Sequence, residues 1–524
     1  MNCTLSDLLA AVPELAPIRQ RAIHEKLLQN PLLALRYDSR MATAGTVFFC
    51  LVGKTSDGHL YAPSAYRNGC RIFAVERELD LPKDALQLLV PDTRKALADC
   101  SAVFYDHPER HMRLIGLTGT KGKTTTSLLI RTLLEEAGIP AGYIGTNGVD
   151  YRNYHFQTVN STPESAEIYR YLRSMLDEGV GVCVLEVSSQ ALWMERTRGL
   201  CFDTVLFTNL SRDHIGGVEH PDWEHYRDCK RRLFTDYPTE AVAVNHDDPN
   251  SAYMVDQTTA PLLKFGLTSS EEKPLWYACD LRPLRQADRL GVGFAVYRGG
   301  VPLGNDWFLP LPGHFNIQNA LAALTVVCER FGVDVAMAKK ILSHATVQGR
   351  FEAFSSPALP NVSFIIDYAH NGVSLASILD ALKIYEPKRL ICLFGSVGGR
   401  TTERRRDLAE AAGPRCDLCI LTSDNPACEP PEAIIDEIDA AFPEGSCPRI
   451  KITDRASAIR HAVEIAQEGD VILLAGKGHE NYQLVGTVKE PFSEIDILRD
   501  ALADLERADS DIPENVEWAF DYDC

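Results

Sequence analysis

The sequence predicts an α/β protein whose domains are built on parallel sheets, and three observations support this fold class. Residues 113–137 place a short apolar strand before a glycine-rich turn and a long helical pattern. Residues 182–189, 204–211 and 241–248 are apolar runs that end in polar residues, as strands buried in a parallel sheet do. From residue 348 onward, apolar strands alternate with helices, which is typical of a doubly wound domain.

The chain divides into three regions, and its 524 residues are enough for several domains with separate cores. Residues 1–110 contain two short strands with a helical segment between them. Residues 111–347 contain the glycine-rich turn, a stretch of short strands and turns over 276–311, and a strong helix at 315–332. Residues 348–524 contain five strands but lack the glycine pattern of a dinucleotide-binding domain. We therefore expect one domain in each of these three regions.

Composition argues against several classes of protein. The chain has 53 Lys and Arg residues against 72 Asp and Glu residues, and this net charge of −19 argues against binding to nucleic acid or to an anionic membrane. The first residues lack the pattern of a signal peptide, and no apolar run is long enough to span a membrane. The 15 cysteines are scattered, so we expect reduced, mostly buried thiols in a cytoplasmic protein, which we also expect to be a monomer. Cys416 and Cys419 form a lone C-x-x-C, which favours strand packing over a zinc site.

The glycine-rich stretch GLTGTKGKTTTSLLI predicts a phosphate site. A strand–turn–helix brings backbone N–H groups and a helix N-terminus to one point, where they bind anions. Gly119 and Gly122 allow a close approach of the backbone, Lys123 adds a positive charge, and Thr124 offers a hydroxyl to Mg²⁺. The spacing is G-x-x-G-K-[ST] rather than the strict P-loop pattern, since Leu117 stands where its first glycine would be. The alternative is an ordinary glycine-rich turn.

Polar residues follow the neighbouring strands at their carboxyl ends, where ligands bind in open α/β sheets. VLEVSSQ places Glu186 at the end of a strand that we expect beside the phosphate loop. A carboxylate there is suited to hold Mg²⁺, directly or through water, and the alternative is a buried ion pair. FTNLSRDH places His214 beyond the end of the next strand, where it is a metal ligand or an ordinary surface histidine.

The third region has four strand ends that break into glycine and polar residues: IIDYAHNG, FGSVGGRTTERRRD, TSDNPA and AGKGHENYQ. Because the carboxyl ends of parallel strands meet at one edge, we expect a single polar rim there. Its charged residues have both signs, which suits a zwitterionic or amine substrate. The residues expected at this rim are Arg400, Asp424, Asn425, Lys477, His479 and Glu480.

The order and spacing of these motifs resemble the Mur ligases, the ATP-dependent amide-forming enzymes of peptidoglycan precursor synthesis. The likeness covers nearly the whole chain and runs through YDSRMATAGTVFFCLVGKTSDGH, GLTGTKGKTTT, NSTPES, LEVSSQAL, FTNLSRDH, LPGHFNIQNALAA, GRFE, DYAHNG, DNPA and GKGHENYQ. It is strongest with the ligases that add the third amino acid to UDP-N-acetylmuramoyl-L-alanyl-D-glutamate. The resemblance implies an N-terminal UDP-binding domain, a central P-loop ATPase domain with a parallel sheet, and a C-terminal Rossmann-like domain for the amino acid.

The resemblance also implies the reaction and its cofactors, ATP and Mg²⁺. ATP phosphorylates the free carboxylate of D-glutamate, and the amine of the incoming amino acid attacks the acyl phosphate to give the amide. The residues that would contact ATP are Gly119, Thr120, Lys121, Gly122, Lys123, Thr124, Thr125, Asn316, Asn319, Arg350 and Asp367.

The catalytic and metal-binding residues follow from the same resemblance. Lys230 stands where the family has a carbamylated lysine (N6-carboxylysine), whose carboxylate can bridge to metal, and the alternative is a solvent-facing lysine. The implied catalytic residues are Lys123, Glu186, His214 and Lys230, and the implied magnesium ligands are Thr124, Glu186, His214 and Lys230.

Two further sets of contacts are implied for the two other substrates. The UDP-muramoyl dipeptide would contact Ser39, Lys54, Thr55, Ser56, Asn160, Ser161, Thr162, Ser188 and Arg196. The amino acid would contact Arg400, Asp424, Asn425, Pro426, Ala427, Gly476 and Glu480. The chain departs from the family pattern at Gln190, at Met194 and in the loop IGGVEH after His214.

The motif DNPA indicates which amino acid is added. Members that add meso-diaminopimelate have D-N-P-R, whose arginine pairs with the distal carboxylate, whereas Ala427 stands here. We therefore expect a substrate with only an amine at its far end, L-lysine first, and Glu429 nearby could favour that ammonium. Ornithine and meso-diaminopimelate remain alternatives, the latter if another arginine reaches the substrate.

Three other functions remain open from the sequence. A related ligase of the superfamily, such as a folylpolyglutamate synthetase, is disfavoured by the DSR segment and the DNP loop. A non-catalytic nucleotide-binding scaffold is disfavoured because the loop lysine, its threonine and Glu186 are all present. A P-loop motor or switch GTPase would need a guanine-reading N-K-x-D motif, which does not follow the loop.

Overall fold

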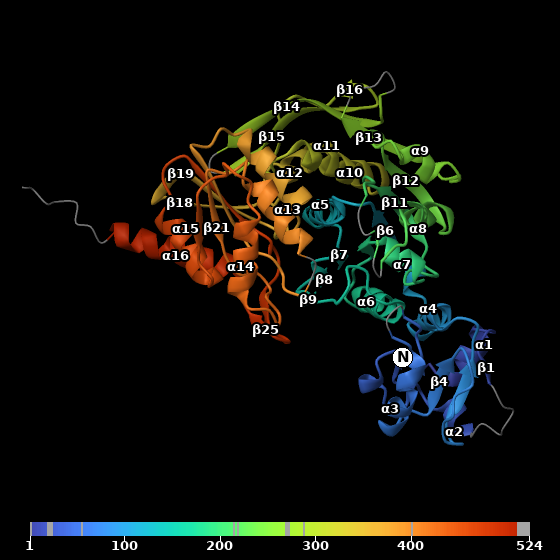
Figure 1. Ribbon diagram of the computed structural model, residues 1–524. Coiled ribbons are helices and arrows are strands. Elements are labelled where there is room, and N and C mark those ends of the chain that lie inside the picture. The colour runs from blue at the N-terminus through green and yellow to red at the C-terminus, as the bar shows by residue number, and fades with distance from the viewer. Residues whose placement is uncertain are drawn as a thin grey trace, which may run out of the picture. The chain divides into compact units, whose positions relative to one another are not determined.

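The computed structural model of the protein describes residues 3–17, 25–53, 56–212, 215–216, 219–267, 273–286, 289–399 and 402–510. The chain, drawn in Figure 1, divides into two compact units. The first contains residues 1–278, 296–303 and 318–341, and the second contains residues 279–295, 304–317 and 342–524. Among the described residues, no helix combines the length and the apolar character needed to cross a lipid bilayer.

The N-terminal part of the first unit is a five-stranded sheet in the order β1-β5-β4-β3-β2. Strands β2 to β5 are parallel and β1 is antiparallel. Alternate residues of β3 face opposite sides: Val47 and Phe49 join a core with Leu97 of α4, and Phe48 joins a second core with Ala62 of α3. The elements are α1 (Leu5–Ala11), β1 (Ala16–Pro17), α2 (Glu25–Gln29), β2 (Ala34–Arg36), η1 (Ser39–Met41), β3 (Thr46–Phe49), η2 (Gly58–Tyr61), α3 (Ala62–Arg67), β4 (Ile72–Val75), β5 (Leu86–Leu89), α4 (Thr93–Phe104) and η3 (Pro108–Arg110).

The central sheet of the first unit contains the predicted apolar strands. Its order is β13-β12-β11-β6-β10-β7-β8-β9, parallel from β13 to β7 and antiparallel over β8 and β9. The order places β10 and β11 on either side of β6, so the strand ends with polar residues flank the strand that leads into the phosphate loop. The elements are β6 (Arg113–Thr118), α5 (Lys123–Glu136), β7 (Ala141–Gly145), β8 (Gly148–Tyr151), β9 (Tyr154–Phe156), α6 (Ser165–Asp177), β10 (Val182–Glu186), α7 (Ser189–Trp193), β11 (Phe202–Phe207), α8 (Trp223–Thr235), β12 (Thr239–Asn245), α9 (Ser251–Val255) and β13 (Leu262–Leu267).

Residues 276–311 differ from the prediction of short strands, because two of their strands are long. The strand β14 has 11 residues and β15 has 10 residues, and they continue the sheet beyond β13, with β16 and β17 both pairing β15. Over the second half of β14, exposed residues alternate with partly buried ones, so the sequence shows no continuous apolar run there, whereas β15 is mostly buried. The elements are β14 (Trp276–Gln286), β15 (Arg289–Arg298), β16 (Val301–Pro302), β17 (Trp307–Leu309), α10 (His314–Arg330) and α11 (Val335–Leu342).

The second unit contains a six-stranded sheet in the order β18-β19-β23-β20-β21-β22, parallel from β19 to β22. Helices α15 and α16 lie together on one side of it (Figure 1), and they pack on alternate strand residues such as Phe364 and Ile472. Cys419 on β21 is buried with its Sγ 3.5 Å from Cys447 Sγ, and Cys416 is also buried, in agreement with strand packing.

The elements from residue 352 onward include the five predicted strands, β19 to β23, with helices between them, and a separate two-stranded sheet of β24 and β25. They are β18 (Glu352–Ser356), β19 (Leu359–Asp367), α12 (Gly372–Lys383), β20 (Arg389–Phe394), α13 (Glu403–Ala412), β21 (Leu418–Leu421), α14 (Pro431–Ala440), β22 (Arg449–Lys451), α15 (Arg455–Glu464), β23 (Asp470–Ala475), β24 (Tyr482–Val485), β25 (Val488–Pro491) and α16 (Glu494–Ser510).

Candidate active site

The phosphate loop joins β6 to α5 with the strand–turn–helix geometry predicted from the sequence. The helix begins directly after Gly122, whose φ of 84° lies in the left-handed region that favours glycine. A Cβ atom on Gly119 would lie 1.9 Å from Thr208 Oγ1, so the loop and the end of β11 approach too closely for any larger residue. Asn209 holds the loop from the same side, because its Oδ1 accepts from Lys121 N at 3.0 Å and its Nδ2 donates to Lys121 O at 2.9 Å.

Two lysines converge on one carbonyl of this loop. Lys123 Nζ donates to Gly119 O at 2.9 Å and to Thr120 O at 3.1 Å, and Lys230 Nζ, from α8, donates to Gly119 O at 2.9 Å. Lys230 is only 2% exposed, and its Nζ lies 4.7 Å from the ring centre of Tyr226, so it is not a solvent-facing lysine. The Lys123 ammonium at a loop rich in N–H donors suits a polyphosphate, and Lys230 lies beside it.

Glu186 lies at the end of β10 and is completely buried. Its Oε1 accepts from Tyr143 Oη at 2.5 Å and from Thr146 N at 3.2 Å, and its Oε2 accepts from Thr124 Oγ1 at 3.2 Å and Thr146 Oγ1 at 3.0 Å. In the described part of the chain its partners are hydroxyl and amide groups, which disfavours the buried ion pair. The Thr124 hydroxyl and the Glu186 carboxylate are hard oxygen donors of the kind that Mg²⁺ prefers. His214, the third expected ligand, lies outside the described residues.

The remaining nucleotide contacts of the first unit surround the same loop. Thr125 is buried in the first turn of α5, and Thr120 Oγ1 donates to the carbonyl of Ser211 at 3.1 Å. Asn319 on α10 accepts from Thr126 Oγ1 at 3.2 Å. Its side chain lies so close to Gly122 that a Cβ atom there would be 2.4 Å from its Oδ1. The structure therefore brings Asn319 to the phosphate loop.

Three expected nucleotide contacts lie in the second unit. Asp367 ends β19 and accepts from the N–H groups of Phe351 at 2.9 Å and Ala369 at 2.8 Å. Burial raises the pKa of Asp367, and the positive charge of Arg350 opposes that rise. Asn316 Nδ2 donates to the backbone carbonyl four residues before it at 2.7 Å. The positive charge of Arg350 thus acts on Asp367 at the end of β19.

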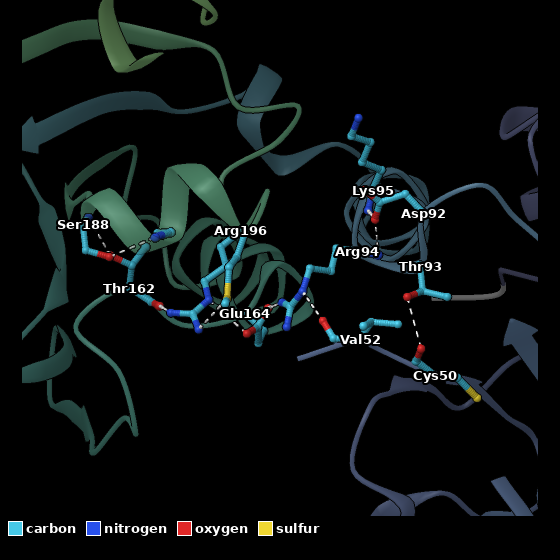
Figure 2. Close-up of polar contacts among 12 residues, drawn as sticks. Cys50, Val52, Asp92, Thr93, Arg94, Lys95, Thr162, Glu164, Ser188 and Arg196 are labelled. Carbon is cyan, nitrogen blue, oxygen red and sulfur yellow. Dashed lines mark hydrogen bonds and ion pairs between the residues drawn. The ribbon is translucent and has the colours of Figure 1, made fainter. Parts of the chain in front are cut away.

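The residues expected to position the dipeptide form a hydrogen-bonded cluster, which Figure 2 shows. Thr162 Oγ1 accepts from Ser188 N at 3.1 Å, and Arg196 Nη1 donates to Thr162 O at 3.1 Å. Arg196 Nε also donates to Glu164 Oε1 at 2.9 Å, while Arg94 Nη1, from α4, donates to Glu164 Oε2 at 3.1 Å. Glu164 therefore lies between two arginines and links the N-terminal sheet to the central sheet.

Asn160 and Ser161 precede this cluster in the chain. Ser161 Oγ lies 3.0 Å from Thr146 Oγ1, whose hydroxyl donates to Glu186 Oε2. Ser161 is therefore separated from the Thr124–Glu186 pair by one hydrogen-bonded side chain. Asn160 is exposed, so its side chain is accessible to a ligand.

The residues expected at the uridine end are described only in part. Ser39 begins η1, and its carbonyl accepts from Asn68 Nδ2 at 2.9 Å. The carbonyl of Ser56 accepts from Gly53 N at 2.8 Å, which closes a short turn. Lys54 and Thr55 lie outside the described residues.

The carboxyl ends of β19, β20, β21 and β23 surround one cavity of about 220 Å³ in the second unit. Its wall contains acids and bases together: Asp424 and Glu480, and Arg404 and Lys489. The other lining residues are Tyr368, His370, Val397, Gly398, Asn425, Gly476, Tyr482 and Leu484. The predicted polar rim thus exists as one cavity with both signs of charge.

Lys477 lies beneath the cavity wall and contacts its acidic residues. It is completely buried, and its Nζ donates to Asn425 Oδ1 at 3.2 Å and to Glu480 Oε2 at 3.1 Å. The same Nζ lies 3.6 Å from Asp424 Oδ1. The centre of the His479 ring lies 4.8 Å from that of Tyr368, which lines the cavity. Lys477 and His479 therefore support the cavity wall, whereas Asp424, Asn425 and Glu480 form it.

The DNPA loop is held by the β24–β25 hairpin. Ala427 has a φ of 52°, its N–H donates to Leu484 O at 3.0 Å, and its carbonyl accepts from Gly486 N at 2.8 Å. Neither Pro426 nor Ala427 is among the residues that line the cavity, whereas Gly476 is. Arg400 lies outside the described residues.

Glu429 does not have the position that the lysine hypothesis gave it. Its Oε2 accepts from Arg405 Nη2 at 2.5 Å and its Oε1 accepts from Gly399 N at 2.7 Å. The hydrogen bond from the Gly399 N–H, and then the one from Arg405, lower the pKa of this carboxyl. Glu429 is thus paired with Arg405 and is not among the residues that line the cavity.

Sequence reasoning missed several side chains that complete these sites. Arg404 lies in the basic run TTERRRDL, which could have marked a ligand site. Lys489 comes from the β24–β25 hairpin, and no sequence motif predicts where this hairpin lies in the fold. Arg94 and Tyr143 likewise act on partners far away in the chain, Glu164 and Glu186, so no local spacing reveals them.

Comparison with known proteins identifies the family. Models of three of its parts match the chain: "Mur ligase family, catalytic domain" over residues 33–105, "Mur ligase middle domain" over residues 117–327, and "Mur ligase, glutamate ligase domain" over residues 349–478. Each match falls within one of the three regions expected from the sequence.

Relatives of similar length carry the name UDP-N-acetylmuramoyl-L-alanyl-D-glutamate–2,6-diaminopimelate ligase. One from Caldanaerobacter subterraneus subsp. tengcongensis is 36% identical over 93% of this chain and 98% of its own. Another from Geobacillus thermodenitrificans is 36% identical over 90% of this chain and 95% of its own. A solved structure of a ligase with this name superposes with a TM-score of 0.66 and 27% identity, and covers 97% of this chain and 100% of the other.

The resemblance and the three-domain α/β fold class predicted from the sequence are therefore confirmed. The chain belongs to the Mur ligase family, the ATP-dependent amide ligases of peptidoglycan synthesis.

Proposed function

We propose that the protein uses ATP to join a free diamino acid to UDP-N-acetylmuramoyl-L-alanyl-D-glutamate. The observation that supports this best is the composition of the phosphate loop and its surroundings. Lys123 and Lys230 meet at the Gly119 carbonyl, and the Thr124–Glu186 pair lies in the same part of the first unit. The names of the curated relatives support the same substrates.

In this reaction an oxygen of the D-glutamate carboxylate attacks the γ-phosphorus of ATP, and ADP leaves. The amine of the diamino acid then attacks the acyl carbon, and phosphate leaves with the bridging oxygen and the amide forms. Backbone N–H groups of the loop and the Lys123 ammonium stabilise the charge that spreads over the phosphoryl oxygens. The positions of Gly119 and Gly122 allow the backbone to approach the phosphates.

Thr124 and Glu186 would hold a magnesium ion, which neutralises phosphate charge when bound. His214 and Lys230 are proposed as further ligands. Lys230 would act as N6-carboxylysine, whose carboxylate replaces the ammonium group. Its almost complete burial shields such a carbamate from water.

The Thr162–Ser188–Arg196 cluster would position the muramoyl dipeptide. Arg196 is held by Glu164 and by the Thr162 carbonyl, so its guanidinium is fixed before any ligand binds. Arg94 approaches Glu164 from α4 and would couple binding at the N-terminal sheet to the position of Arg196. Ser39, Lys54, Thr55, Ser56, Asn160 and Ser161 are proposed as the remaining contacts of this substrate.

The cavity of the second unit would bind the amino acid, and meso-diaminopimelate is the candidate that the comparisons favour. This substrate has two ammonium and two carboxylate groups, and the cavity wall has two acids, Asp424 and Glu480, and two bases, Arg404 and Lys489. Arg404 offers the bidentate guanidinium that Ala427 lacks. The curated relatives cited above are named for this amino acid.

L-lysine is the second candidate, and Ala427 is the observation that favours it. Position 427 has no side chain that could pair with a distal carboxylate. The lysine hypothesis also relied on Glu429 to favour the distal ammonium group, but Glu429 pairs with Arg405. The charge balance of the cavity therefore favours diaminopimelate over lysine.

The test is phosphate release by the purified protein with Mg-ATP, the UDP-muramoyl dipeptide and one amino acid at a time, with the product mass as confirmation. Release with meso-diaminopimelate above lysine and ornithine is expected. Release with lysine alone would keep the ligase and reject diaminopimelate. No release with any of the three would reject the proposed function.

A further inference from the structure

A group of soft and borderline metal ligands lies where α8 meets α7, two helices that pack side by side (Figure 1). His220, His225 and Cys229 each offer one ligand atom, and these atoms all lie within 4.8 Å of one another. His225 and Cys229 are four residues apart on α8, so their side chains leave the same face of the helix. His220 comes from the loop that precedes the helix.

The distances among these atoms are close to those of a metal site. Cys229 Sγ lies 3.6 Å from His225 Nδ1, and His220 Nδ1 lies 2.8 Å from His225 Nδ1. Tetrahedral zinc, with Zn–N near 2.0–2.1 Å and Zn–S near 2.3 Å, separates a nitrogen from a sulfur by about 3.6 Å and two nitrogens by about 3.3 Å. The Cys229–His225 pair already fits, the two imidazoles need to separate by about 0.5 Å, and the ligand atoms of Cys229 and His220 lie within 4.8 Å of each other.

The surroundings orient the ligands and shield them from water. Ser189 Oγ lies 2.9 Å from His220 Nε2, so the outer nitrogen of this ring is engaged and Nδ1 points toward His225. The ring of Trp193 packs 6.0 Å from the His220 ring and 5.1 Å from the His225 ring. His220 and Cys229 are buried, whereas His225 is partly exposed and leaves a path for an ion.

We propose that His220, His225 and Cys229 bind a zinc ion through two Nδ1 atoms and a thiolate, with water in the fourth position. Binding releases the thiol proton of Cys229 to solvent. Thiolate and imidazole ligands select zinc over Mg²⁺, so this site differs in chemistry from the Thr124–Glu186 pair.

The zinc ion would tie the first turns of α8 to the loop before it. Cys229 directly precedes Lys230, which donates to the carbonyl of Gly119 in the phosphate loop. The proposed site is thus a structural clamp on the helix that delivers Lys230.

The test uses the full chain, stripped with a chelator and then titrated with Co²⁺ and with Zn²⁺. Wild type should bind one Co²⁺ with a thiolate-to-cobalt charge-transfer band in the near ultraviolet, and Zn²⁺ should displace it. Cys229→Ser should lose the band, and His225→Gln should weaken Zn²⁺ binding at least about tenfold in competition with a chromophoric chelator. Cys201→Ser and His155→Gln, which change an exposed cysteine and an exposed histidine, are the matched controls.

The outcomes separate the proposed site from binding elsewhere on a chain with many cysteines. Loss of the band in Cys229→Ser but not in Cys201→Ser supports the site. A band that survives in Cys229→Ser, or an affinity for Zn²⁺ that His225→Gln leaves unchanged, overturns it. Because Cys229→Ser is nearly isosteric, a near-ultraviolet circular dichroism spectrum like that of wild type shows that the variant is folded. Zn²⁺ should raise the thermal midpoint of wild type and of the two controls but not that of Cys229→Ser.

Discussion

The phosphate loop and the amino-acid cavity are built in opposite ways. The loop is a continuous segment whose backbone would bind phosphate, and the half-buried Asn209 and the buried Glu186 hydrogen-bond to it and to Thr124. The cavity is formed by side chains from four strand ends and a hairpin, and its bases Arg404 and Lys489 come from segments far apart in the chain. In the function we propose, the loop would bind the phosphates of ATP, whereas the cavity would determine which amino acid is added.

This difference predicts how the two regions respond to substitution. In the loop, close contacts around Gly119 and Gly122 leave no room for change, so substitutions should abolish turnover. In the cavity, single substitutions should change the affinity for one substrate and leave the chemical step nearly intact.

The largest effect is expected for Lys123→Ala. The variant removes a charge that would stabilise the transferred phosphoryl group, so ATP turnover should fall about 10³-fold. Phosphate release under saturating substrates measures it, and Lys383→Ala, at an exposed lysine on α12, is the control. Turnover within tenfold of wild type would mean that the loop does not bind ATP as we propose.

A smaller and more selective effect is expected for Arg404→Ala. If Arg404 pairs with a substrate carboxylate, its loss should raise KM for meso-diaminopimelate about 10- to 100-fold while KM for ATP stays constant. The control is Arg406→Ala, two residues away on α13, whose side chain is 61% exposed and pairs with Glu410. An equal effect of both variants would place Arg404 outside the amino-acid site.

Arg94→Ala should have a moderate effect on the third substrate. Its ion pair with Glu164 is largely buried, with 17% and 12% of the two side chains exposed, so its loss frees Glu164 and Arg196 to move. We expect KM for the UDP-muramoyl dipeptide to rise about 3- to 10-fold. Arg173→Ala, which breaks an exposed pair with Asp177 on α6, is the control and should leave this KM unchanged.

The smallest effect is expected for the pH dependence of stability through His370. Burial lowers the pKa of this cavity histidine below its ordinary value of 6.5. The unfolded chain therefore binds a proton more readily, and the free energy of unfolding should fall as the pH drops from 6.5 toward the lowered pKa.

Urea unfolding at a series of pH values measures this slope. His370→Gln should remove part of the fall in the free energy of unfolding at acid pH. His155→Gln, at an exposed histidine, should not. Identical slopes in wild type and His370→Gln would show that His370 is not buried in its neutral form.

The phosphate loop and the cavity also differ in how well the sequence predicts them. The loop was predictable residue by residue because its glycines, lysine and threonine act within one strand–turn–helix. The rim of the cavity was predictable, since parallel strand ends meet at one edge. The residues that would select the amino acid were not predictable. Ala427 hydrogen-bonds to the β24–β25 hairpin instead of lining the cavity, and Arg404, which does line it, comes from another strand end.

Other misses have the same physical origin. The pairing of Glu429 with Arg405, and of Glu164 with Arg94 and Arg196, depends on tertiary contacts that no spacing encodes. The long strand β14 was predicted as short because its second half is exposed or only partly buried, and no motif marks the length of the mostly buried β15.

The central claim is that the carboxylate is activated by phosphorylation before the amine attacks it. It is tested most directly with a UDP-muramoyl dipeptide whose D-glutamate carboxylate oxygens are ¹⁸O. The account predicts one ¹⁸O atom in each phosphate released, because the bridging oxygen leaves with phosphorus. Phosphate without ¹⁸O, formed at the same rate as the amide, would contradict it.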